Sequence, residues 1–202
     1  MSALSIPRLK RTLRSEMRAR VGALEPERAS EAGRAAAKRL LGLPEIEAAS
    51  GLLVFLSFGL EIDTQPLIEE WQARGRALFV PRLVRPGTPL EVCRSPCLLE
   101  TSSFGIRQPV AEVPGLGGAE LEAELDAAVV PGLAFDLECH RLGYGAGTFD
   151  RFLAERRLFT AGFGYDLQVV ERVPVEAHDV ALSRVVTEVR VLAPRGSSTT
   201  GC

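Results

Sequence analysis

The sequence lacks long hydrophobic runs, is poor in cysteine and has no excess of charge of one sign. The longest apolar run covers residues 48–56 and is interrupted by Ser50 and Gly51, whereas a membrane span needs about 20 apolar residues. Four cysteines in 202 residues exclude a disulfide-dense mini-protein. A net charge of −2 is far from the basic balance of a protein that binds bulk nucleic acid.

The cysteines and the N-terminus bear on the cellular compartment. Cys93 and Cys97 form a C-x₃-C pair with no second pair at zinc-site spacing. We expect structural or incidental thiols; a four-donor site with Cys139 and His140 is the alternative if their loops meet. The first 21 residues lack the apolar core of a secretory signal, so we expect a cytoplasmic protein. Because this segment is Arg-rich and amphipathic, a mitochondrial presequence is the alternative.

What is present is an ordinary globular composition with an excess of glycine and proline. Hydrophobic residues make up 46% and charged residues 25%, with 19 glycines and 13 prolines. A chain of this length buries roughly 70% of the surface that its unfolded form exposes, so its core needs no disulfide or metal. The excess of glycine and proline indicates that the chemistry lies in loops.

The first predicted helix presents two neighbouring stripes. One is apolar and one is basic, each recurring at every fourth residue: Leu9, Leu13 and Met17, then Lys10, Arg14 and Arg18. A basic row that borders a buried row can reach an anion over the edge of the core. The alternative is a solvated helix face.

Later segments alternate between helix and strand. In chain order we predict a helix at 27–43 with Ala29, Ala32, Ala36 and Leu40 inside, a strand at 51–58, a helix at 65–74, a strand at 76–81, an irregular stretch at 86–118 with a strand near 90–93, a strand at 126–131, a helix from about 149, and strands at 159–163 and 185–192. Strand–helix–strand units within about 30 residues build parallel sheets covered on both faces. We therefore expect one α/β domain over 1–193, with a mostly parallel central sheet and helices on both faces, and a disordered tail at 194–202.

A glycine-rich loop follows the strand at 126–131. Gly143, Gly145 and Gly147 alternate just before the helix begins. Glycines at this spacing let backbone N–H groups converge, and the helix adds its positive end, which together favour a phosphate. Asp150 could hold a magnesium ion beside it. The loop is neither a Walker A motif nor a dinucleotide fingerprint, and the alternative is a glycine turn that permits tight packing.

Four segments in order carry a family resemblance: KRTLR at 10–14; LSFGLEIDT at 56–64; VPGLAFD at 130–136, running on to RLGYG at 141–145 and FDR at 149–151; and VPVEAHD at 173–179. Together they resemble the 5-formyltetrahydrofolate cyclo-ligase family over residues of about 8 to 192. The resemblance implies conversion of 5-formyltetrahydrofolate to 5,10-methenyltetrahydrofolate with ATP and Mg²⁺. The formyl oxygen would attack the γ-phosphate, N10 would close the ring, and ADP and phosphate would leave.

The resemblance also implies the site residues. Those implied to bind ATP are Lys10, Arg11, Arg14, Arg141, Leu142, Gly143, Tyr144, Gly145, Ala146, Gly147, Thr148 and Phe149. Those implied to bind the folate are Leu56, Glu61, Tyr144, Gly145, Ala146, Gly147 and Thr148. Those implied to hold magnesium are Asp150 and Asp179, and those implied to act in catalysis are Lys10, Arg141 and Asp150. His178 lies in the last of the four segments and could orient a metal ligand or the nucleotide; the alternative is a structural role.

This chain departs from the family pattern at five positions. Ala146, Thr148 and Phe149 replace Gly, Tyr and Tyr in the glycine-rich loop, Cys139 stands where glycine is common, and Gln108 replaces a glutamate. An alanine at 146 requires a backbone φ that is not positive, or strain. These changes bear on substrate affinity more than on fold.

Two alternatives to the ligase hypothesis remain at this point. One is a non-catalytic folate or nucleotide sensor that kept the fold while its loop diverged. The other is RNA binding through the basic N-terminal helix, which the slight acidity of the chain and the lack of an aromatic-rich basic face disfavour. We expect a monomer whose partners are the folate and ATP, with no nucleic acid and no membrane.

Overall fold

The buried apolar segments of the sequence form the centre of a mixed eight-stranded sheet. The computed structural model describes residues 5–84, 88, 90–102 and 105–195. The strand order is β13-β12-β10-β7-β1-β2-β3-β6. Its five central strands run parallel: β12 (Arg184–Val186), β10 (Phe159–Phe163), β7 (Ala127–Val130), β1 (Gly51–Val54) and β2 (Ala77–Arg82).

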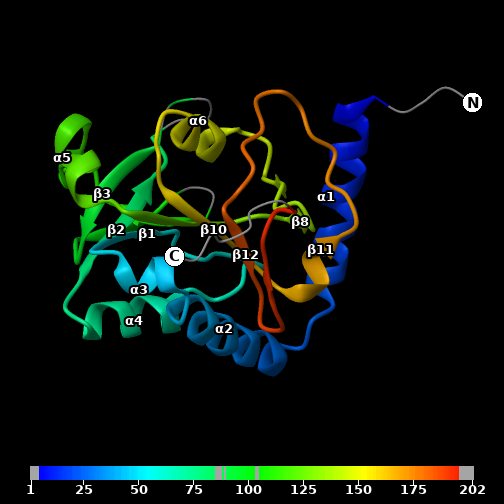
Figure 1. Ribbon diagram of the computed structural model, residues 1–202, viewed down its shortest axis with the longest axis horizontal. Coiled ribbons are helices and arrows are strands. Elements are labelled where there is room, and N and C mark those ends of the chain that lie inside the picture. Colours follow the sequence, from blue (N-terminus) through cyan, green and yellow to red (C-terminus); the bar gives the residue numbers. More distant parts are fainter. Residues whose placement is uncertain (1–4, 85–87, 89, 103–104, 196–202) are drawn as a thin grey trace, which may run out of the picture.

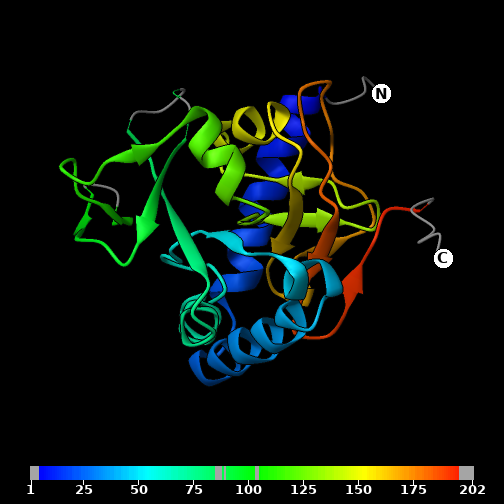
Figure 2. The same cartoon turned by 60° about the vertical axis from the view of Figure 1, so that its left-hand side comes forward.

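Antiparallel strands complete the two edges. These are β13 (Val191–Leu192) on one side, and β3 (Glu91–Ser95) with β6 (Gly115–Leu116) on the other. A hairpin of β4 (Leu99–Thr101) and β5 (Arg107–Pro109) belongs to the same side. Strands β3 to β5 form an arm that projects from the body (green, at the left of Figure 2).

Both faces of the sheet are covered because successive strand residues point to opposite sides. In β1, Leu52 and Val54 belong to one apolar cluster, and Leu53 belongs to another. Figure 1 shows α2, α3 and α4 below the sheet and α6 above it. The helices are α1 (Ile6–Gly22), α2 (Pro26–Leu41), α3 (Pro44–Ala48), α4 (Gln65–Ala73), α5 (Gly118–Glu124) and α6 (Thr148–Ala154), with a 3₁₀ turn at Asp166–Gln168. The predicted mostly parallel α/β domain is confirmed.

Helix α1 packs on a small second sheet rather than on the main one. This sheet has the order β11 (Val169–Val170), β8 (Ala134–Asp136) and β9 (Arg141–Leu142), and it lies beside α1 (Figure 1). Met17 is fully buried here, in a cluster with Leu142 and Val173. The small sheet was not predicted from the sequence, because two- and three-residue strands carry too little periodicity.

The predicted inner stripe of α1 is wrong at its first position. Leu9 is 37% exposed, whereas Lys10 is only 7% exposed. The buried row is Lys10, Met17 and Val21, a helical spacing of seven and four residues. Lys10 can be buried because two carboxylates neutralise it, as described below.

Three predicted segments differ from the observed ones. The strand expected at 51–58 ends at Val54. In the stretch 86–118, the strand expected near 90–93 is confirmed as β3, but the remainder, expected to be irregular, also holds β4 to β6. The strand expected at 185–192 is a hairpin of β12 and β13. Thr187 makes its turn, since its hydroxyl oxygen accepts the backbone N–H of Val189 and of Arg190 at 3.2 and 3.0 Å.

Two expectations concern the ends and the helices of the chain. Most of the tail predicted to be disordered, residues 196–202, lies outside the described residues, as does Cys202. None of the helices in the described residues is long and apolar enough to cross a membrane.

Candidate active site

A cavity of about 590 Å³ lies at the carboxyl ends of three central strands, a size typical of small-molecule sites. Phe55 and Leu56 follow β1, Leu83 follows β2 and Pro131 follows β7. Ligands of open α/β sheets bind at these ends, because loops there diverge around a crevice. Helix α1, the glycine-rich loop and the segment 176–179 complete the walls.

One end of the cavity is built around Lys10. Its Nζ lies 2.7 Å from Glu176 Oε2 and 2.6 Å from Asp179 Oδ2. Burial lowers the pKa of Lys10, but the hydrogen bonds to Asp179 and Glu176 outweigh it and the net shift is upward. For Asp179 burial raises the pKa, and the hydrogen bond from Lys10 reverses the sign, so the pKa is lowered. Lys10 and Asp179 are therefore both charged at neutral pH.

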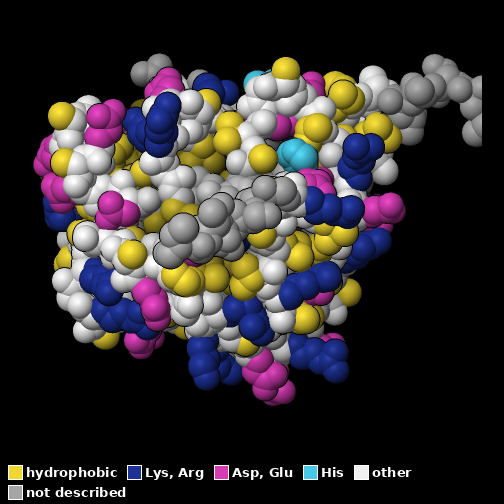
Figure 3. Space-filling model, in the orientation of Figure 1, with side chains coloured by type: hydrophobic (Ala, Val, Ile, Leu, Met, Phe, Trp, Pro, Cys, Tyr) yellow, Lys and Arg dark blue, Asp and Glu magenta, His cyan; other side chains and the backbone are white. Residues whose placement is uncertain are grey.

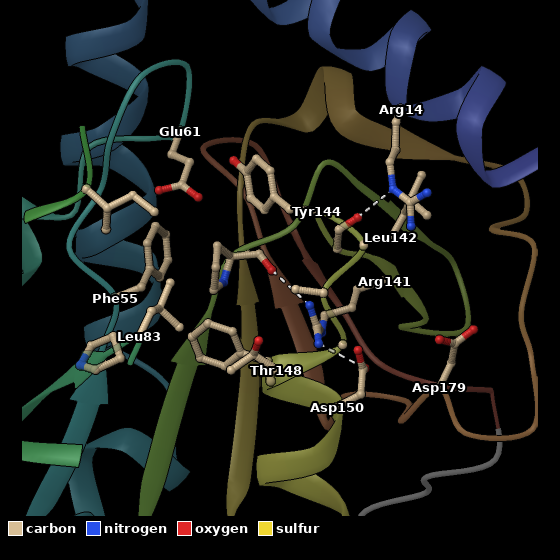
Figure 4. A pocket seen from close by; sticks show the side chains of 18 of the residues that line it. Arg14, Phe55, Glu61, Leu83, Arg141, Leu142, Tyr144, Thr148, Asp150 and Asp179 are labelled. Carbon is tan, nitrogen blue, oxygen red and sulfur yellow. Dashed lines mark hydrogen bonds and ion pairs between the residues drawn. The ribbon is translucent and has the colours of Figure 1, made fainter. Parts of the chain in front are cut away.

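The glycine-rich loop wraps over Arg14. Arg14 Nε donates a hydrogen bond to the carbonyl oxygen of Gly143 at 2.9 Å (Figure 4). A Cβ at Gly145 would lie 3.5 Å from the Arg14 guanidinium. Gly145 and Gly147 have positive φ angles of 110° and 64°, and Ala146 has none. Positions 145 and 147, whose left-handed backbone favours glycine, are occupied by glycine. Position 146, whose φ is not positive, accepts an alanine without strain.

Arg141 and Asp150 form a buried ion pair at the floor of the cavity. Arg141 Nη2 lies 2.8 Å from Asp150 Oδ1, and the two side chains are 4% and 13% exposed. Burial lowers the pKa of Arg141, and Asp150 opposes the shift. The Arg141 guanidinium also lies over the ring of Phe149, 5.7 Å from its centroid. Its Nε has no hydrogen-bond partner within the described part of the chain.

The other end of the cavity is more apolar and is marked by Glu61. The carboxylate accepts the backbone N–H of Phe58 at 3.1 Å and faces Tyr144 (Figure 4). The rings of Phe58 and Tyr144 lie 5.8 Å apart. Burial raises the pKa of Glu61 to about 7, although hydrogen bonding to Tyr144 and Phe58 opposes it. The side chain is therefore poised between its neutral and charged forms near neutral pH.

The structure brings nearly all predicted site residues to this cavity. Those that line it are Lys10, Arg14, Leu56, Glu61, Arg141, Leu142, Gly143, Tyr144, Gly145, Ala146, Gly147, Thr148, Phe149, Asp150 and Asp179. Arg11 does not line it, and its side chain is exposed. The helix turns Arg11 away by about 100° relative to Lys10.

Sequence reasoning missed nine lining residues: Pro7, Phe55, Phe58, Pro81, Leu83, Ile106, Arg107, Pro131 and Glu176. His178, for which two roles were left open, also lines the cavity. Glu176 and His178 lie inside a segment that was singled out, so their spacing from Asp179 was the available signal. Ile106 and Arg107 come from the projecting arm, and no local pattern places that arm over the cavity. For them the sequence offered no signal.

The carboxylates fit a magnesium ion held mainly by phosphates rather than by the protein alone. Within the described ranges, no group of three or more His, Cys, Asp or Glu side chains could hold a metal. Asp150 and Asp179 each line the cavity beside a cation. Mg²⁺ commonly binds one or two carboxylates together with substrate phosphates, which this arrangement allows. The alternative four-donor site at the cysteines is not formed by the described residues, where Cys93 and Cys139 are buried free thiols.

The charge is mixed both on the surface and in the cavity. On the face shown in Figure 3, Lys and Arg side chains lie along the lower and right-hand edges with Asp and Glu between them. The cavity gathers Lys10, Arg14 and Arg141 around one end, where carboxylates pair with Lys10 and Arg141.

A mostly parallel α/β fold with a cavity of this size at the carboxyl ends of its strands is typical of enzymes that act on small molecules. The comparison with protein families specifies it further: residues 7–188 match the model of the 5-formyltetrahydrofolate cyclo-ligase family. The chain belongs to this family.

The similarity to individual relatives extends over nearly the whole chain. A 5-formyltetrahydrofolate cyclo-ligase of Escherichia coli (strain K12) is 35% identical over 181 residues, covering 87% of this chain and 98% of that protein. One from Mus musculus is 27% identical over 203 residues, covering 93% and 98%. The solved structure of Aquifex aeolicus 5,10-methenyltetrahydrofolate synthetase superposes with a TM-score of 0.79 at 29% identity, covering 96% of this chain and 97% of that one.

Proposed function

We propose that this protein converts 5-formyltetrahydrofolate and ATP to 5,10-methenyltetrahydrofolate, ADP and phosphate, with Mg²⁺. The observation that carries the proposal is the difference between the two ends of this cavity. Three cations and a glycine-rich loop occupy one end, and a carboxylate among aromatic rings occupies the other. A site of this kind can hold a polyphosphate and a pterin side by side.

The cationic end suits the phosphates of ATP. Among the described residues, the side chain of Arg14 donates a hydrogen bond only to a backbone carbonyl, so its guanidinium keeps donors for an oxyanion. Lys10 is held at the cavity by Glu176 and Asp179, and Arg141 is held by Asp150. We propose that the loop at 143–147, which is hydrogen-bonded to Arg14 of α1, covers the nucleotide.

The Glu61 end suits the pterin ring. A carboxylate can accept a pair of N–H donors from the ring N–H and amino group, and Phe58 and Tyr144 offer aromatic surfaces beside it. Leu56 and Phe55 add apolar surface to the wall of the cavity. We propose that the pterin binds with its formyl group toward the phosphates.

The chemistry then needs alignment and charge stabilisation rather than a protein nucleophile. The formyl oxygen forms a bond to the γ-phosphorus as the bond to ADP breaks, and N10 then attacks the formyl carbon as phosphate leaves. Lys10, Arg14 and Arg141 stabilise the charge on the transferring phosphoryl group. Asp150 and Asp179 are the residues that would hold Mg²⁺, which when bound neutralises phosphate charge.

A coupled assay tests the proposal. Purified protein with 5-formyltetrahydrofolate and Mg-ATP is expected to release ADP in step with the absorbance of the methenyl product. Release of ADP without that product contradicts the proposal. Tight binding of 5-formyltetrahydrofolate without turnover at saturating ATP instead supports a folate sensor that retains the fold.

A further inference from the structure

Asp136 is a buried carboxylate that does not line the cavity but lies in the sheet next to it. It ends β8 and is 2% exposed. Neither Lys nor Arg forms an ion pair with it in the part of the chain that the structure describes. Its two oxygens instead serve two different segments of backbone. A buried carboxylate with such partners fixes the relative position of what it binds.

Oxygen Oδ1 closes the turn that leads into Arg141. It accepts the backbone N–H of Glu138 at 2.9 Å and of His140 at 3.0 Å. This turn joins β8 to β9, where Phe135 pairs with Arg141. Cys139 lies inside the turn with a φ of 61°, a conformation that costs energy for a residue with a Cβ. The bonds to Asp136 help to hold this strained turn, and with it the position of Arg141.

Oxygen Oδ2 holds the segment that neutralises Lys10. It accepts the backbone N–H of Val173 at 3.0 Å, and His140 Nδ1 lies 3.2 Å away. Val173 is 1% exposed in the apolar cluster beneath α1. Three and six residues further on, Glu176 and Asp179 bind the Lys10 ammonium. The same carboxylate therefore anchors both halves of the cationic end.

We infer that Asp136 is a positioning residue that sets Arg141 and the carboxylate partners of Lys10 in one frame, so that both cations meet the phosphates of one ATP molecule. The inference rests on the proposed function for the identity of the anion. The Glu61 end of the cavity makes no contact with Asp136 among the hydrogen bonds of the described residues. Substitution of Asp136 should therefore weaken the binding of ATP and leave the binding of the folate unchanged.

The variant Asp136→Asn tests this. The side chain keeps its size, but one acceptor oxygen becomes an NH₂ donor that faces an N–H group. We expect the Kd and the KM for Mg-ATP to rise roughly tenfold to a hundredfold, because both cations shift, while the KM for 5-formyltetrahydrofolate stays within about twofold. The Kd is measured by calorimetry with Mg-ATP, and the KM values by the coupled assay.

Asp126→Asn is the matched control. Asp126 Oδ2 also accepts two backbone N–H groups, of Ser50 at 2.7 Å and Gly51 at 3.1 Å. It precedes β7, at the end of the sheet opposite the cavity. Substitution of a carboxylate with a purely structural role lowers the folded fraction and hence the apparent kcat, but it leaves both KM values unchanged. We expect this behaviour of Asp126→Asn and not of Asp136→Asn.

The outcomes separate the two hypotheses. An unchanged Kd and KM for ATP in folded Asp136→Asn overturns the inference. If this variant does not fold, His140→Ala removes only the side-chain contact to Oδ2, and a rise in the ATP Kd of roughly twofold or more is expected, while no rise overturns the inference. If the wild-type protein binds ATP but forms no methenyl product, the proposed function fails and the Kd comparison still decides the role of Asp136. If it binds no ATP, both fail.

Discussion

At the residue scale, the cavity holds three ionisable side chains whose charges are compensated differently: Lys10 and Arg141 are buried, and Glu61 is partly buried. Lys10 has two carboxylate partners and Arg141 has one. Glu61 has no cationic partner within the described residues, and it accepts only weaker donors. Because an uncompensated buried charge is costly, Glu61 is the group whose protonation should be visible in measurements of stability.

Glu61→Gln should stabilise the protein in a pH-dependent way. Burial raises the pKa of Glu61 to about 7 from 4.5, so between these values the folded state binds more protons than the unfolded state. Stability therefore falls as the pH rises through this window, and a neutral glutamine escapes the loss. We expect the variant to exceed the wild type by about 2–3 kcal/mol in free energy of unfolding at pH 8, and by little at pH 4.5. Urea unfolding at both pH values measures it; equal differences would contradict it.

Asp150→Asn should cost both activity and stability. The substitution removes the charge that compensates Arg141, whose side chain is only 4% exposed. It also weakens the binding of a magnesium ion at this position. We expect near-complete loss of turnover and a loss of about 2–4 kcal/mol in free energy of unfolding. Glu45→Gln breaks the Arg184–Glu45 ion pair away from the cavity and serves as the control, with activity unchanged. Normal turnover in Asp150→Asn would show that Asp150 serves only Arg141.

At the element scale, the glycine-rich loop is constrained by backbone conformation as much as by its ligand. Gly147 caps α6 in the left-handed region with a φ of 64°. A Cβ there would lie 3.0 Å from Arg151 Nη1. Arg151 in turn donates from Nη2 to the carbonyl oxygen of Ala146 at 2.6 Å. The loop is thus closed by its own backbone, and a Cβ at 147 would disturb that closure.

Gly147→Ala should lower stability by about 1–2 kcal/mol and raise the KM for ATP. The strain arises from the left-handed conformation, and the loop shifts to relieve it. Gly75→Ala is the matched control, since Gly75 has a φ of 68° with nothing within 4 Å of a Cβ and follows α4. It should lose similar stability without a change in KM. Equal KM values in the two variants would mean that the loop does not bind ATP. Thermal unfolding and steady-state kinetics measure both effects.

At the scale of the whole molecule, the cavity joins parts that are otherwise separate. Its walls come from three strands of the main sheet, from α1 on the small sheet, and from the projecting arm through Ile106 and Arg107. A ligand that fills it contacts all of them. Bound substrate should therefore stabilise the protein as a unit, by the linkage between binding and folding.

Mg-ATP at about 100 times its Kd should raise the free energy of unfolding by about 2.7 kcal/mol. Removal of the metal with EDTA should abolish most of this gain, because the carboxylates at positions 150 and 179 then face phosphate without a bridging cation. Thermal unfolding with and without nucleotide measures it, and EDTA without nucleotide is the control. An undiminished gain in EDTA would contradict a role for magnesium.

The sequence alone was enough to predict the central strands, α2 and most of the candidate site, but not the small sheet or the arm. Short apolar runs and the period of 3.6 report which residues are buried locally, and so β2, β7, β10 and α2 were found near their observed bounds. The motif residues at 141–150 are consecutive in the chain. Their proximity to one another could therefore be predicted without knowledge of the tertiary structure. The positive φ at Gly145 and Gly147 was compatible with the alanine between them.

Only the tertiary structure decided which charges meet. Lys10 and Glu176 are 166 positions apart, and their contact depends on α1 packing against the small sheet beside β11. That contact buries Lys10 and exposes Leu9, the reverse of what local hydrophobicity predicts. The arm residues Ile106 and Arg107 and the anchoring carboxylate of Asp136 are likewise set by long-range packing. Periodicity records burial along the chain, whereas the pairing of charges is set by distances across it.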